Sequence, residues 1–569
     1  MKSKYIKNNE LSAKDKGKKV TLHGWVANKR RFGEMTFIDL RDRYGITQCV
    51  FKTDLNVTKE SSMEVIGKVV LRKQKNPNLA TGDIEVVVDK YTIFSEANEE
   101  LPFAIRDDID VKEETRMKYR FLDLRRPVMQ QNIITKDKIM FAVREFMHQN
   151  DFIDIETPML AKSTPEGARD FLVPTRNRDE FWALPQSPQL FKQLLMCSGF
   201  EKYYQFARCF RDEDSRKDRQ PEFTQLDIET SFLNVEDFQK YIEKLFKHIF
   251  KSIGIKIKTP FPRVKYFDAL RDYGTDKPDL RYDYKIVDIN DFCLNTDFNI
   301  IKYAPSKRML FVDTLITKKD FKDLEEIAKK NKANILFYFV YENGEIVHTN
   351  FANKVKDAAL ELVKNNKNKN GSYFIVANTY DHASQALGAV RVELNERFNY
   401  ARKEWNLSWI TDWPMFEYDE ENNTWAAAHH PFTRFAHSLE ELDKIEMKDV
   451  RALSYDLVLN GFELGSGSAR IFDKKTQKKM FDLIGMIEKE QQSRFDWFLK
   501  AFDYGIPPHC GIGLGLDRLT MIITGQKTIR DVIAFPKNAK NQDVFTGAPG
   551  SVDKKQLDEL FLEIKKEDK

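Results

Sequence analysis

Residues 203–229 read YYQFARCFRDEDSRKDRQPEFTQLDIE, and this segment predicts two antiparallel strands joined by a long polar loop. Alternation in the second strand separates a mostly polar face from an apolar one. The polar face carries Phe223, Gln225, Asp227 and Glu229, whereas the other face carries Thr224, Leu226 and Ile228. Because a polar row on an antiparallel strand usually faces water, the row alone fits either a solvated surface or a binding site.

A short helix is predicted ahead of this hairpin. Ser187 and Pro188 stand in the order preferred at a helix cap and first turn, and Gly199 ends the helix. The residues expected to form its buried stripe are Leu190, Phe191, Leu194 and Leu195. Lys192 falls outside that stripe, and a helical lysine is usually solvated, so its position alone assigns it no function.

A second hairpin is predicted around Asn460 and Gly461, which favour a two-residue turn. In that register Val458 pairs with Glu463, so Asp456 and Glu463 lie diagonally opposite on one face. Two such carboxylates repel unless a cation lies between them, and oxygen ligands of this kind suit Mg²⁺. The alternative is a surface pair in which each carboxylate reaches its own basic neighbour.

Residues 511–518 read GIGLGLDR and predict a strand that runs into a helix. Glycines at alternate positions leave one strand face without side chains, so a flat ligand could approach the backbone. Arg518 falls in the first helical turn, where its charge gains nothing from the helix dipole, and we expect it to bind an anion. The spacing differs from the dinucleotide-binding G-x-G-x-x-G pattern, and the chain contains no phosphate-binding G-x-x-x-x-G-K-[ST] sequence.

Composition excludes several classes of protein. The 569 residues suggest three or four domains, and 92 basic against 88 acidic residues give a net charge of +4, which by itself does not indicate a nucleic-acid partner. No apolar run is long enough to span a membrane. The cysteines are too widely spaced for a disulfide framework or a zinc site, so we expect a reduced, cytoplasmic protein: Cys49, Cys197, Cys209, Cys293 and Cys510.

The flanking sequence predicts further elements. Five short strands fit a small barrel of the oligonucleotide-binding type: 20–26, 35–40, 46–51, 68–72 and 83–88. A helix through Ile139 and Met147 stops near Asn150 and precedes a strand that Pro158 terminates. Such a helix and strand fit either an intersubunit contact or packing within one chain.

Six strings resemble the signature regions of class II aminoacyl-tRNA synthetases, and their detail resembles the bacterial aspartyl members almost from end to end. They are TPEGARD (164–170), LPQSPQLFKQ (184–193), FRDED (210–214), RQPEFTQ (219–225), HHPFT (429–433) and GLGLDR (513–518). The resemblance implies that the chain activates L-aspartate with ATP and transfers it to the 3′-terminal adenosine of tRNA(Asp). It also implies a homodimer.

The resemblance further implies a multidomain α+β fold. An OB-fold anticodon-binding barrel would occupy residues 1–105 and a connector 106–130. The catalytic domain, an antiparallel sheet flanked by helices, would comprise 131–284 and 405–540. An inserted α/β domain would occupy 285–404 and a tail 541–569.

For ATP, the resemblance implies that Arg211 holds the α-phosphate, Phe223 stacks on adenine and Arg518 clamps the γ-phosphate. These two arginines are the candidate catalytic residues. Other expected ATP-binding residues are Asp212, Glu213, Gln220, Glu463 and Gly515. Mg²⁺ would be held by Asp456 and Glu463.

For aspartate, the resemblance places Lys192 and Arg470 on the side-chain carboxylate. Two cations there would discriminate against asparagine, whose amide is neutral. The other residues expected at this substrate are Glu166, Ser187, Gln189, Asp227 and His429. Strict alternation from Glu463 would put Arg470 on the wrong strand face, so a bulge or the strand end is expected within Gly465–Ser468.

For tRNA, Phe37, Gln48 and Glu85 match barrel positions that stack on or read anticodon bases in this family. Unpaired bases bind such barrels by stacking on aromatic side chains, and Arg30 could meet a phosphate. Arg216, in the long hairpin loop, would reach the acceptor end.

Two residues depart from the family pattern, because Ser466 and Cys510 stand where glycines are usual. We expect both side chains to lie near the ATP and aspartate pockets. The alternatives are a noncatalytic RNA-binding paralogue and a related asparaginyl or lysyl enzyme. The sequence leaves open whether tRNA(Asn) is also charged and what the inserted domain does.

Overall fold

The structure is a computed structural model that describes residues 6–163, 167–294, 298–351, 355–419 and 423–565. The chain divides into two compact units, which we describe separately. The smaller unit comprises the residues up to Ile134 together with Ser215–Lys217 and Gln526–Ser551. The larger unit comprises Thr135–Asp214, Asp218–Gly525 and the residues from Val552.

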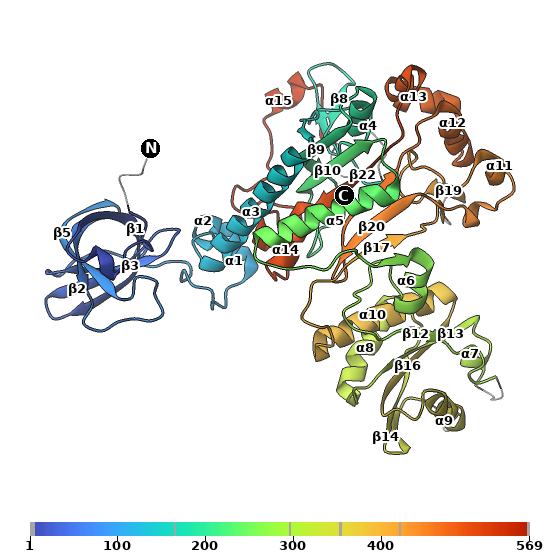
Figure 1. Cartoon of the computed structure of the whole chain (residues 1–569), viewed down its shortest axis with the longest axis horizontal. Helices are drawn as coiled ribbons and strands as arrows, with labels where there is room; N and C mark the ends of the chain where they lie inside the picture. The colour runs from blue at the N-terminus through green and yellow to red at the C-terminus, as the bar shows by residue number, and fades with distance from the viewer. Residues whose placement is uncertain (1–5, 164–166, 295–297, 352–354, 420–422, 566–569) are drawn as a thin grey trace. The chain divides into compact units, whose positions relative to one another are not determined.

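The smaller unit contains the predicted closed five-stranded barrel, in the order β1-β2-β3-β5-β4 (Figure 1). Its strands are β1 (Lys19–Phe32), β2 (Met35–Arg41), β3 (Ile46–Phe51), β4 (Ser62–Leu71) and β5 (Ile84–Ser95). Alternate side chains such as Leu22, Ile38 and Val65 fill the interior.

Strand β4 begins six residues earlier than predicted, at Ser62 instead of residue 68. The difference arises at Gly67, which looks like a strand break in the sequence. A Cβ at this position would lie 2.2 Å from the Val87 carbonyl oxygen, so glycine here permits a close crossing of β4 and β5.

Charged residues of the connector are buried in the same unit. Arg120 in α2 (Arg120–Asp123) donates to the carbonyl oxygens of Arg530 and Ile533, both at 2.7 Å. Asp123 accepts from Arg120 at 2.6 Å and from Arg126 at 2.9 Å. The connector, which also contains α1 (Glu113–Lys118), is therefore a packed element.

The larger unit is built on an eight-stranded sheet that is antiparallel except at its two ends. In order across the sheet, the strands are β11 (Arg263–Lys265), β17 (Leu407–Thr411), β20 (Ser454–Leu459), β21 (Phe462–Ala469), β22 (His509–Gly515), β10 (Glu222–Ser231), β9 (Lys202–Phe210) and β6 (Ile153–Asp154). The β9–β10 hairpin and the Leu459–Phe462 and Val458–Glu463 pairs of the second hairpin are confirmed.

One face of this sheet is the hydrophobic core. It packs against α3 (Pro127–Gln149), α5 (Val235–Ser252) and α14 (Leu516–Ile523), and Figure 1 shows α3 and α5 running alongside it. Leu226 and Ile228 point into this core, as the predicted strand parity requires. The opposite face of β10 is therefore available to polar groups.

A second sheet lies between β11 and β17 in the sequence, within the predicted inserted segment. Its antiparallel order is β12 (Ile286–Asp288), β13 (Ser306–Val312), β16 (Gly371–Asn378), β14 (Phe337–Glu342) and β15 (Glu345–Thr349). One core joins it to α8 (Lys318–Lys330) and α10 (Tyr380–Phe398), and another joins it to α7 (Asn299–Lys302) and α9 (Lys356–Asn365). Helix α6 (Tyr266–Tyr273) also packs on α10, through close backbone contact of Gly274 with Gly388.

The remaining elements surround the polar face or lie in the tail. They are the hairpins β7 (Leu172–Pro174) with β8 (Phe181–Ala183) and β18 (Phe416–Asp419) with β19 (Thr424–Ala427), and the helices α4 (Gln189–Cys197), α11 (Leu439–Leu442), α12 (Lys474–Leu483), α13 (Glu488–Leu499) and α15 (Lys554–Glu559). Among the described residues, no helix has the length and apolar character required to cross a membrane.

Candidate active site

The polar face of the sheet consists of two rows of paired residues across four strands. One row joins Asp227, Gly513, Ser466 and Asp456, and the next joins Glu229, Gly511, Ser468 and Ser454. Both rows lack large side chains on β22 and β21, so charged side chains at either end and from flanking helices can converge above them.

A buried cluster of four charges occupies the β10 side of this face. Lys192 contacts Asp227 at 2.8 Å and Glu229 at 3.4 Å, while Arg470 donates to the two Glu229 oxygens at 2.9 and 3.2 Å. No side chain of the four is more than 2% exposed. Burial would raise the pKa of Glu229, but Arg470 and Lys192 outweigh it and hold that pKa below its ordinary value.

The position of Arg470 depends on a bulge. Leu457 pairs with Gly465 and Val458 pairs with Glu463, so Leu464 is the extra residue. This shift restores Arg470 to the face of Glu463, just beyond the strand end at Ala469. A bulge was required, but its predicted location within Gly465–Ser468 was wrong by one residue, because the apolar Leu464 turns into the core.

His430 completes the environment of Arg470. Its Nε2 lies 2.7 Å from Arg470 Nη1, and Arg470 Nη1 also donates to Ser468 Oγ at 2.7 Å. Burial and the neighbouring Arg470 lower the pKa of His430 well below its ordinary value. His430 is therefore a neutral acceptor that fixes the guanidinium orientation.

Two carboxylates lie at the β20 side of the face, as predicted. Burial and the nearby Asp456 raise the pKa of Glu463, while Arg518 and Lys277 act in the opposite direction. Asp456 Oδ1 is buried and has no hydrogen-bond partner among the described residues, and His429 Nε2 is 3.6 Å from it. The uncompensated oxygen and the repulsion between the carboxyls fit a cation between them.

Two arginines border the same region. The Arg211 guanidinium lies over the Phe223 ring, 5.1 Å from its centroid. Arg518 donates to the Glu463 carbonyl oxygen at 2.6 Å and lies 3.2 Å from Asp218, and its buried Nε has no partner among the described residues. Both guanidinium groups can therefore donate hydrogen bonds to an anionic ligand.

The alternating glycines of β22 are less open than predicted. A Cβ at Gly511 would lie 1.9 Å from Glu229 Oε2, and one at Gly513 would lie 2.2 Å from Gln225 Nε2, so side chains of β10 cover both glycines. Gly515 remains open, with only ordinary contacts to Leu464 and Arg518 around its Cβ position. A flat ligand could therefore approach the backbone only at this end.

The two departures from the family pattern lie on opposite faces of the sheet. Ser466 pairs with Asp456 and Gly513 on the polar face, as expected. Cys510 belongs to the hydrophobic core, so the expectation that its side chain lies near the pockets was wrong. Residues two apart in a strand share a face, so Cys510 lies on the core face with Ile512, whereas Gly511 and Gly513 lie on the polar face.

Helix α4 has two different buried faces, and the predicted single apolar stripe was wrong. The buried residues are Gln189, Leu190, Lys192, Gln193 and Met196. Lys192, expected to be solvated on position alone, is drawn into the site because Asp227 and Glu229 neutralise it. Pro188 caps the helix, and Ser187 Oγ accepts from the Gln189 amide at 3.3 Å.

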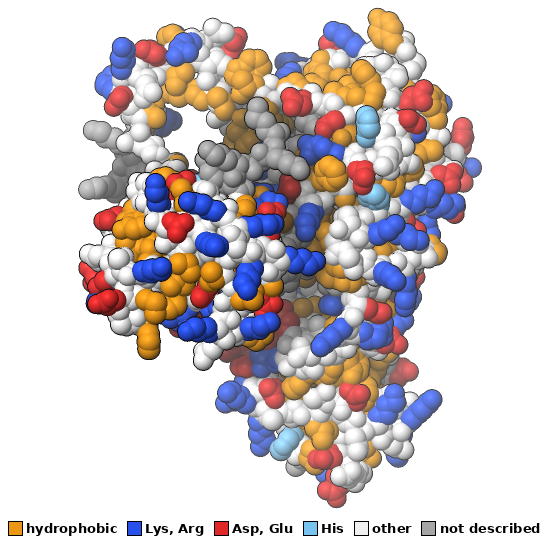
Figure 2. Space-filling view, turned by 60° about the vertical axis from the view of Figure 1, so that its left-hand side comes forward, with side chains coloured by type: hydrophobic (Ala, Val, Ile, Leu, Met, Phe, Trp, Pro, Cys, Tyr) orange, Lys and Arg blue, Asp and Glu red, His pale blue; other side chains and the backbone are white. Residues whose placement is uncertain are grey.

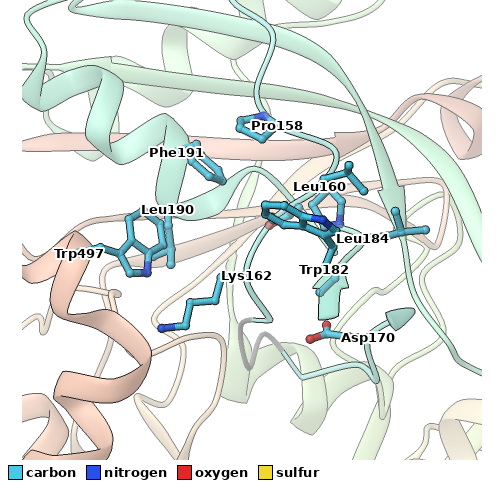
Figure 3. Close-up of a pocket in the computed structure, with 13 residues that line it drawn as sticks. Pro158, Leu160, Lys162, Asp170, Trp182, Leu184, Leu190, Phe191 and Trp497 are labelled. Carbon is cyan, nitrogen blue, oxygen red and sulfur yellow. The ribbon is translucent and has the colours of Figure 1, made fainter. Parts of the chain in front are cut away.

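The other face of α4 borders an apolar cavity of about 290 Å³. Figure 3 shows Phe191 and Leu190 on α4, facing Trp497 of α13, with Trp182 and Leu160 on the far wall. The Phe191 and Trp497 ring centroids are 5.6 Å apart. This cavity shares Ser187 with the predicted aspartate-binding set, and Lys162 and Asp170 add charges to its wall.

The remaining residues predicted to bind ligands are more dispersed. Glu213 accepts from Arg219 at 2.9 Å, Asp212 lies 3.6 Å from Arg169, and Gln220 is buried. Gln189 is buried, and its Nε2 has no partner among the described residues. Arg216 is exposed, and Glu166 lies outside the described residues.

The residues predicted on the barrel lie together on its outer face. Gln48 donates to Glu85 at 2.7 Å and accepts from Arg30 at 3.3 Å and from Arg72 at 2.6 Å. Phe37 is the strand partner of Arg30, so its ring shares this face. In the view of Figure 2, in which the barrel faces the reader, Lys and Arg side chains are scattered over its surface.

Sequence analysis missed several residues of the site. Glu229 was placed on the polar face but was not assigned a role, although it contacts both predicted cations. Arg72 on the barrel was also not predicted as a site residue. The alternation that placed Asp227 on the polar face also placed Glu229 there, whereas nothing in the sequence pattern distinguishes Arg72 from other surface arginines.

Comparisons with known proteins agree with this geometry. A family model described as "tRNA synthetases class II (D, K and N)" matches residues 112–539, and an OB-fold nucleic acid binding domain matches residues 20–94. An aspartate–tRNA ligase from Malacoplasma penetrans is 46% identical, with 97% of each chain covered. An aspartate–tRNA(Asp/Asn) ligase from Dictyoglomus turgidum is 45% identical, covering 98% of this chain and 97% of the relative.

Solved structures support the fold alone. The asparaginyl-tRNA synthetase from Pyrococcus horikoshii complexed with asparaginyl-adenylate superposes with a TM-score of 0.59 at 20% identity, covering 94% of this chain and 98% of the other. An aspartyl tRNA synthetase from Entamoeba histolytica gives 0.57 at 20% identity, covering 94% and 91%. With three quarters of the chain matched by the family model and nearly all of it by the relatives, the chain belongs to the class II tRNA synthetases of the D, K and N group, within its aspartate–tRNA ligase family.

Proposed function

We propose that the chain activates L-aspartate with ATP to aspartyl-adenylate and transfers the aspartyl group to the 3′-terminal adenosine of tRNA(Asp). The observation that carries the proposal is the buried pair of cations, Lys192 and Arg470, on the face of a class II sheet. The relatives named aspartate–tRNA ligase support the choice of amino acid.

The charges of the cluster explain how aspartate would be selected. Lys192 and Arg470 are balanced by Asp227 and Glu229, so the cluster is neutral before substrate binds. The substrate's side-chain carboxylate would meet the two cations, and its ammonium group would lie toward Asp227, Gln189 and Glu166. Asparagine would offer the cations a neutral amide and leave their charge less satisfied. Ser187 and His429 would line the same pocket.

Adenylation requires positioning and charge neutralisation more than proton transfer. The aspartate α-carboxylate is already ionised at neutral pH, so it can attack the α-phosphorus without a general base. Arg211 would hold the α-phosphate beside adenine stacked on Phe223, and Arg518 would hold the γ-phosphate. Asp212, Glu213, Gln220 and Gly515 would shape the nucleotide pocket.

Mg²⁺ would bind Asp456 and Glu463, whose mutual repulsion and unpartnered oxygen fit a divalent cation. When bound, the ion supplies positive charge that neutralises phosphate oxygens. Two carboxylates suffice because Mg²⁺ commonly completes its shell with phosphates and water.

In the second reaction, a hydroxyl of the 3′-terminal adenosine attacks the adenylate carbonyl, and AMP leaves. We assign tRNA binding to the outer face of the barrel, where Phe37 would stack on an anticodon base and Gln48 and Glu85 would read base edges. Arg30 would contact phosphate, and Arg216 would meet the acceptor end. This reading uses the domain boundaries predicted above, with the barrel in 1–105 and the activation site in 131–284 and 405–540.

We also propose a cytoplasmic homodimer. The sheet ends at the short strand β6, where Ile153 is 46% exposed, and Phe141 on α3 is 69% exposed. Met159, Leu160 and Trp182 are further exposed apolar residues of the same unit. An unpaired strand edge beside exposed apolar side chains usually has a partner, and a second copy would cover it. Light scattering would detect the dimer, and Ile153→Lys should yield monomers.

The deciding experiment is ATP–pyrophosphate exchange with aspartate, asparagine, glutamate and lysine in parallel. Exchange with aspartate alone supports the proposal, exchange with asparagine or lysine supports a related enzyme, and no exchange supports a noncatalytic RNA-binding protein. Charging of purified tRNA(Asp) and tRNA(Asn) would then define the tRNA range, because relatives of both kinds are almost equally similar.

A further inference from the structure

The segment just before the inserted sheet, residues 274–279, lies against the β20–β21 turn. A Cβ at Gly461 would lie 3.2 Å from the Asp279 Cβ. Asp279 is buried, its carboxylate pairs with Arg281 at 2.7 Å, and its carbonyl oxygen accepts from Arg391 at 2.9 Å. The segment is therefore held firmly beside the hairpin that carries Glu463.

Lys277 projects from this anchored segment. Pro278 and Asp279 after it are buried, whereas Lys277 is exposed. Its side chain makes no ion pair with any described residue. Lys277 lies two residues before Asp279, whose Cβ would be 3.2 Å from a Cβ on Gly461, so it lies close to the hairpin that carries Glu463. Consistent with this position, the charges of Lys277 and Arg518 favour the ionised Glu463 carboxyl, while the adjacent Asp276 opposes it.

Other lysines around this segment differ in this respect. Lys265 pairs with Asp412 at 3.6 Å, and Lys285 pairs with Asp272 at 3.0 Å. Both lysines therefore serve local surface contacts. Lys277 instead has no ion-pair partner among the described residues. It lies near the hairpin of Glu463, where we propose that Mg²⁺ and the phosphates of ATP bind.

We propose that Lys277 binds the β- and γ-phosphates of ATP and the pyrophosphate formed from them. The inference rests on the proposed function and adds a third cation to Arg211 and Arg518. A lysine ammonium is a compact point charge, which suits phosphate oxygens that need no fixed bidentate geometry.

The chemistry requires charge at this end of the nucleotide. The aspartate carboxylate oxygen forms a bond to the α-phosphorus, and the bond from the α-phosphorus to the bridging oxygen breaks. The electron pair of the broken bond remains on pyrophosphate. Lys277 stays protonated throughout and stabilises this added negative charge.

The test compares nucleotides that differ only in the phosphates. Binding of ATP, pyrophosphate and AMP would be measured by calorimetry at fixed Mg²⁺ for the wild type, Lys277→Met and Lys277→Arg. We expect Lys277→Met to bind ATP and pyrophosphate about tenfold more weakly and AMP equally well. Lys277→Arg should retain most of the affinity, and the control Lys265→Met should match the wild type.

Two results would overturn the proposal. If Lys277→Met binds ATP and pyrophosphate as tightly as the wild type does, Lys277 does not contact these phosphates. If the affinity for AMP falls by the same factor, the substitution acts through the structure of the site. Failure of the wild type to exchange pyrophosphate with aspartate would instead overturn the proposed function. These binding ratios would still report on Lys277 in that case.

Discussion

The aspartate side and the phosphate side of the site balance their charges in different ways. Around Lys192 and Arg470 every charge already has a buried partner of opposite sign, whereas Asp456 and Glu463 repel each other and Asp456 Oδ1 has no hydrogen-bond partner among the described residues. The first region is preorganised to recognise one side chain. The second is complete only when a cation and phosphates enter, so substrate binding should stabilise it more strongly.

Removing Arg470 should produce the largest effect. Arg470→Met removes one of the two cations proposed to bind the substrate carboxylate. It also leaves the buried Glu229 with Lys192 but without Arg470, so the free energy of unfolding should fall by about 3–5 kcal/mol. Aspartate-dependent exchange should fall by about 10³-fold or more. Thermal unfolding and exchange assays would check both results.

The double variant Arg470→Met/Glu229→Gln is the control. It should regain much of the stability, because the unpaired charge is gone, but none of the exchange activity. If the double variant regains activity, Arg470 acts only through folding.

Asp456→Asn tests the phosphate side. Removing one of two repelling carboxylates should leave the ligand-free protein as stable as the wild type or more stable. Exchange should fall by about 10²-fold, as for loss of one electrostatic partner of a transition state, and should need more Mg²⁺. Full activity at wild-type Mg²⁺ concentrations would remove Asp456 from the proposed metal site.

The two glutamates should give opposite pH dependences of stability. The raised pKa of Glu463 means that its protonated form stabilises the fold below about pH 4.5, and this contribution is lost as pH rises through the folded-state pKa. The lowered pKa of Glu229 means that its stabilisation is present above about pH 4.5 and is lost as pH falls through the folded-state pKa.

Urea unfolding without Mg²⁺ from about pH 3 to 8 would measure these slopes, because the Glu229 contribution changes below about pH 4.5. Relative to the wild type, Glu463→Gln should gain stability as pH rises, and Glu229→Gln should lose it. Slopes of the same sign would contradict the contrast between the two sides.

The smallest effect is expected at Cys510, which lies behind the sheet. Cys510→Ala should lower the free energy of unfolding by about 1 kcal/mol without changing KM for ATP or aspartate. Because burial raises the pKa of this thiol to about 12, it should also resist thiol reagents in the folded protein. A change in KM for ATP or aspartate would indicate that the Cys510 side chain does affect the substrate pockets.

The sequence predicted correctly those side-chain positions that depend only on local strand alternation and turn signals. Strand parity correctly placed Asp227 and Glu229, and the turn at Gly461 correctly set the register of Glu463. The burial of Lys192 could not be predicted from helical periodicity, because its partners lie on a strand 35 residues later. The bulge at Leu464 required knowing that this side chain enters the core.

The pairing of Glu229 with Arg470 has a consequence for synthesis of the chain. The two residues are 241 positions apart, and the inserted sheet is made between them. At translation rates of about 5–20 residues per second, Glu229 waits roughly 10–50 seconds before its partner leaves the ribosome. The inserted sheet can therefore fold while the catalytic sheet is still incomplete, and any chain truncated before Arg470 keeps Glu229 beside Lys192 but lacks the arginine that completes its pairing.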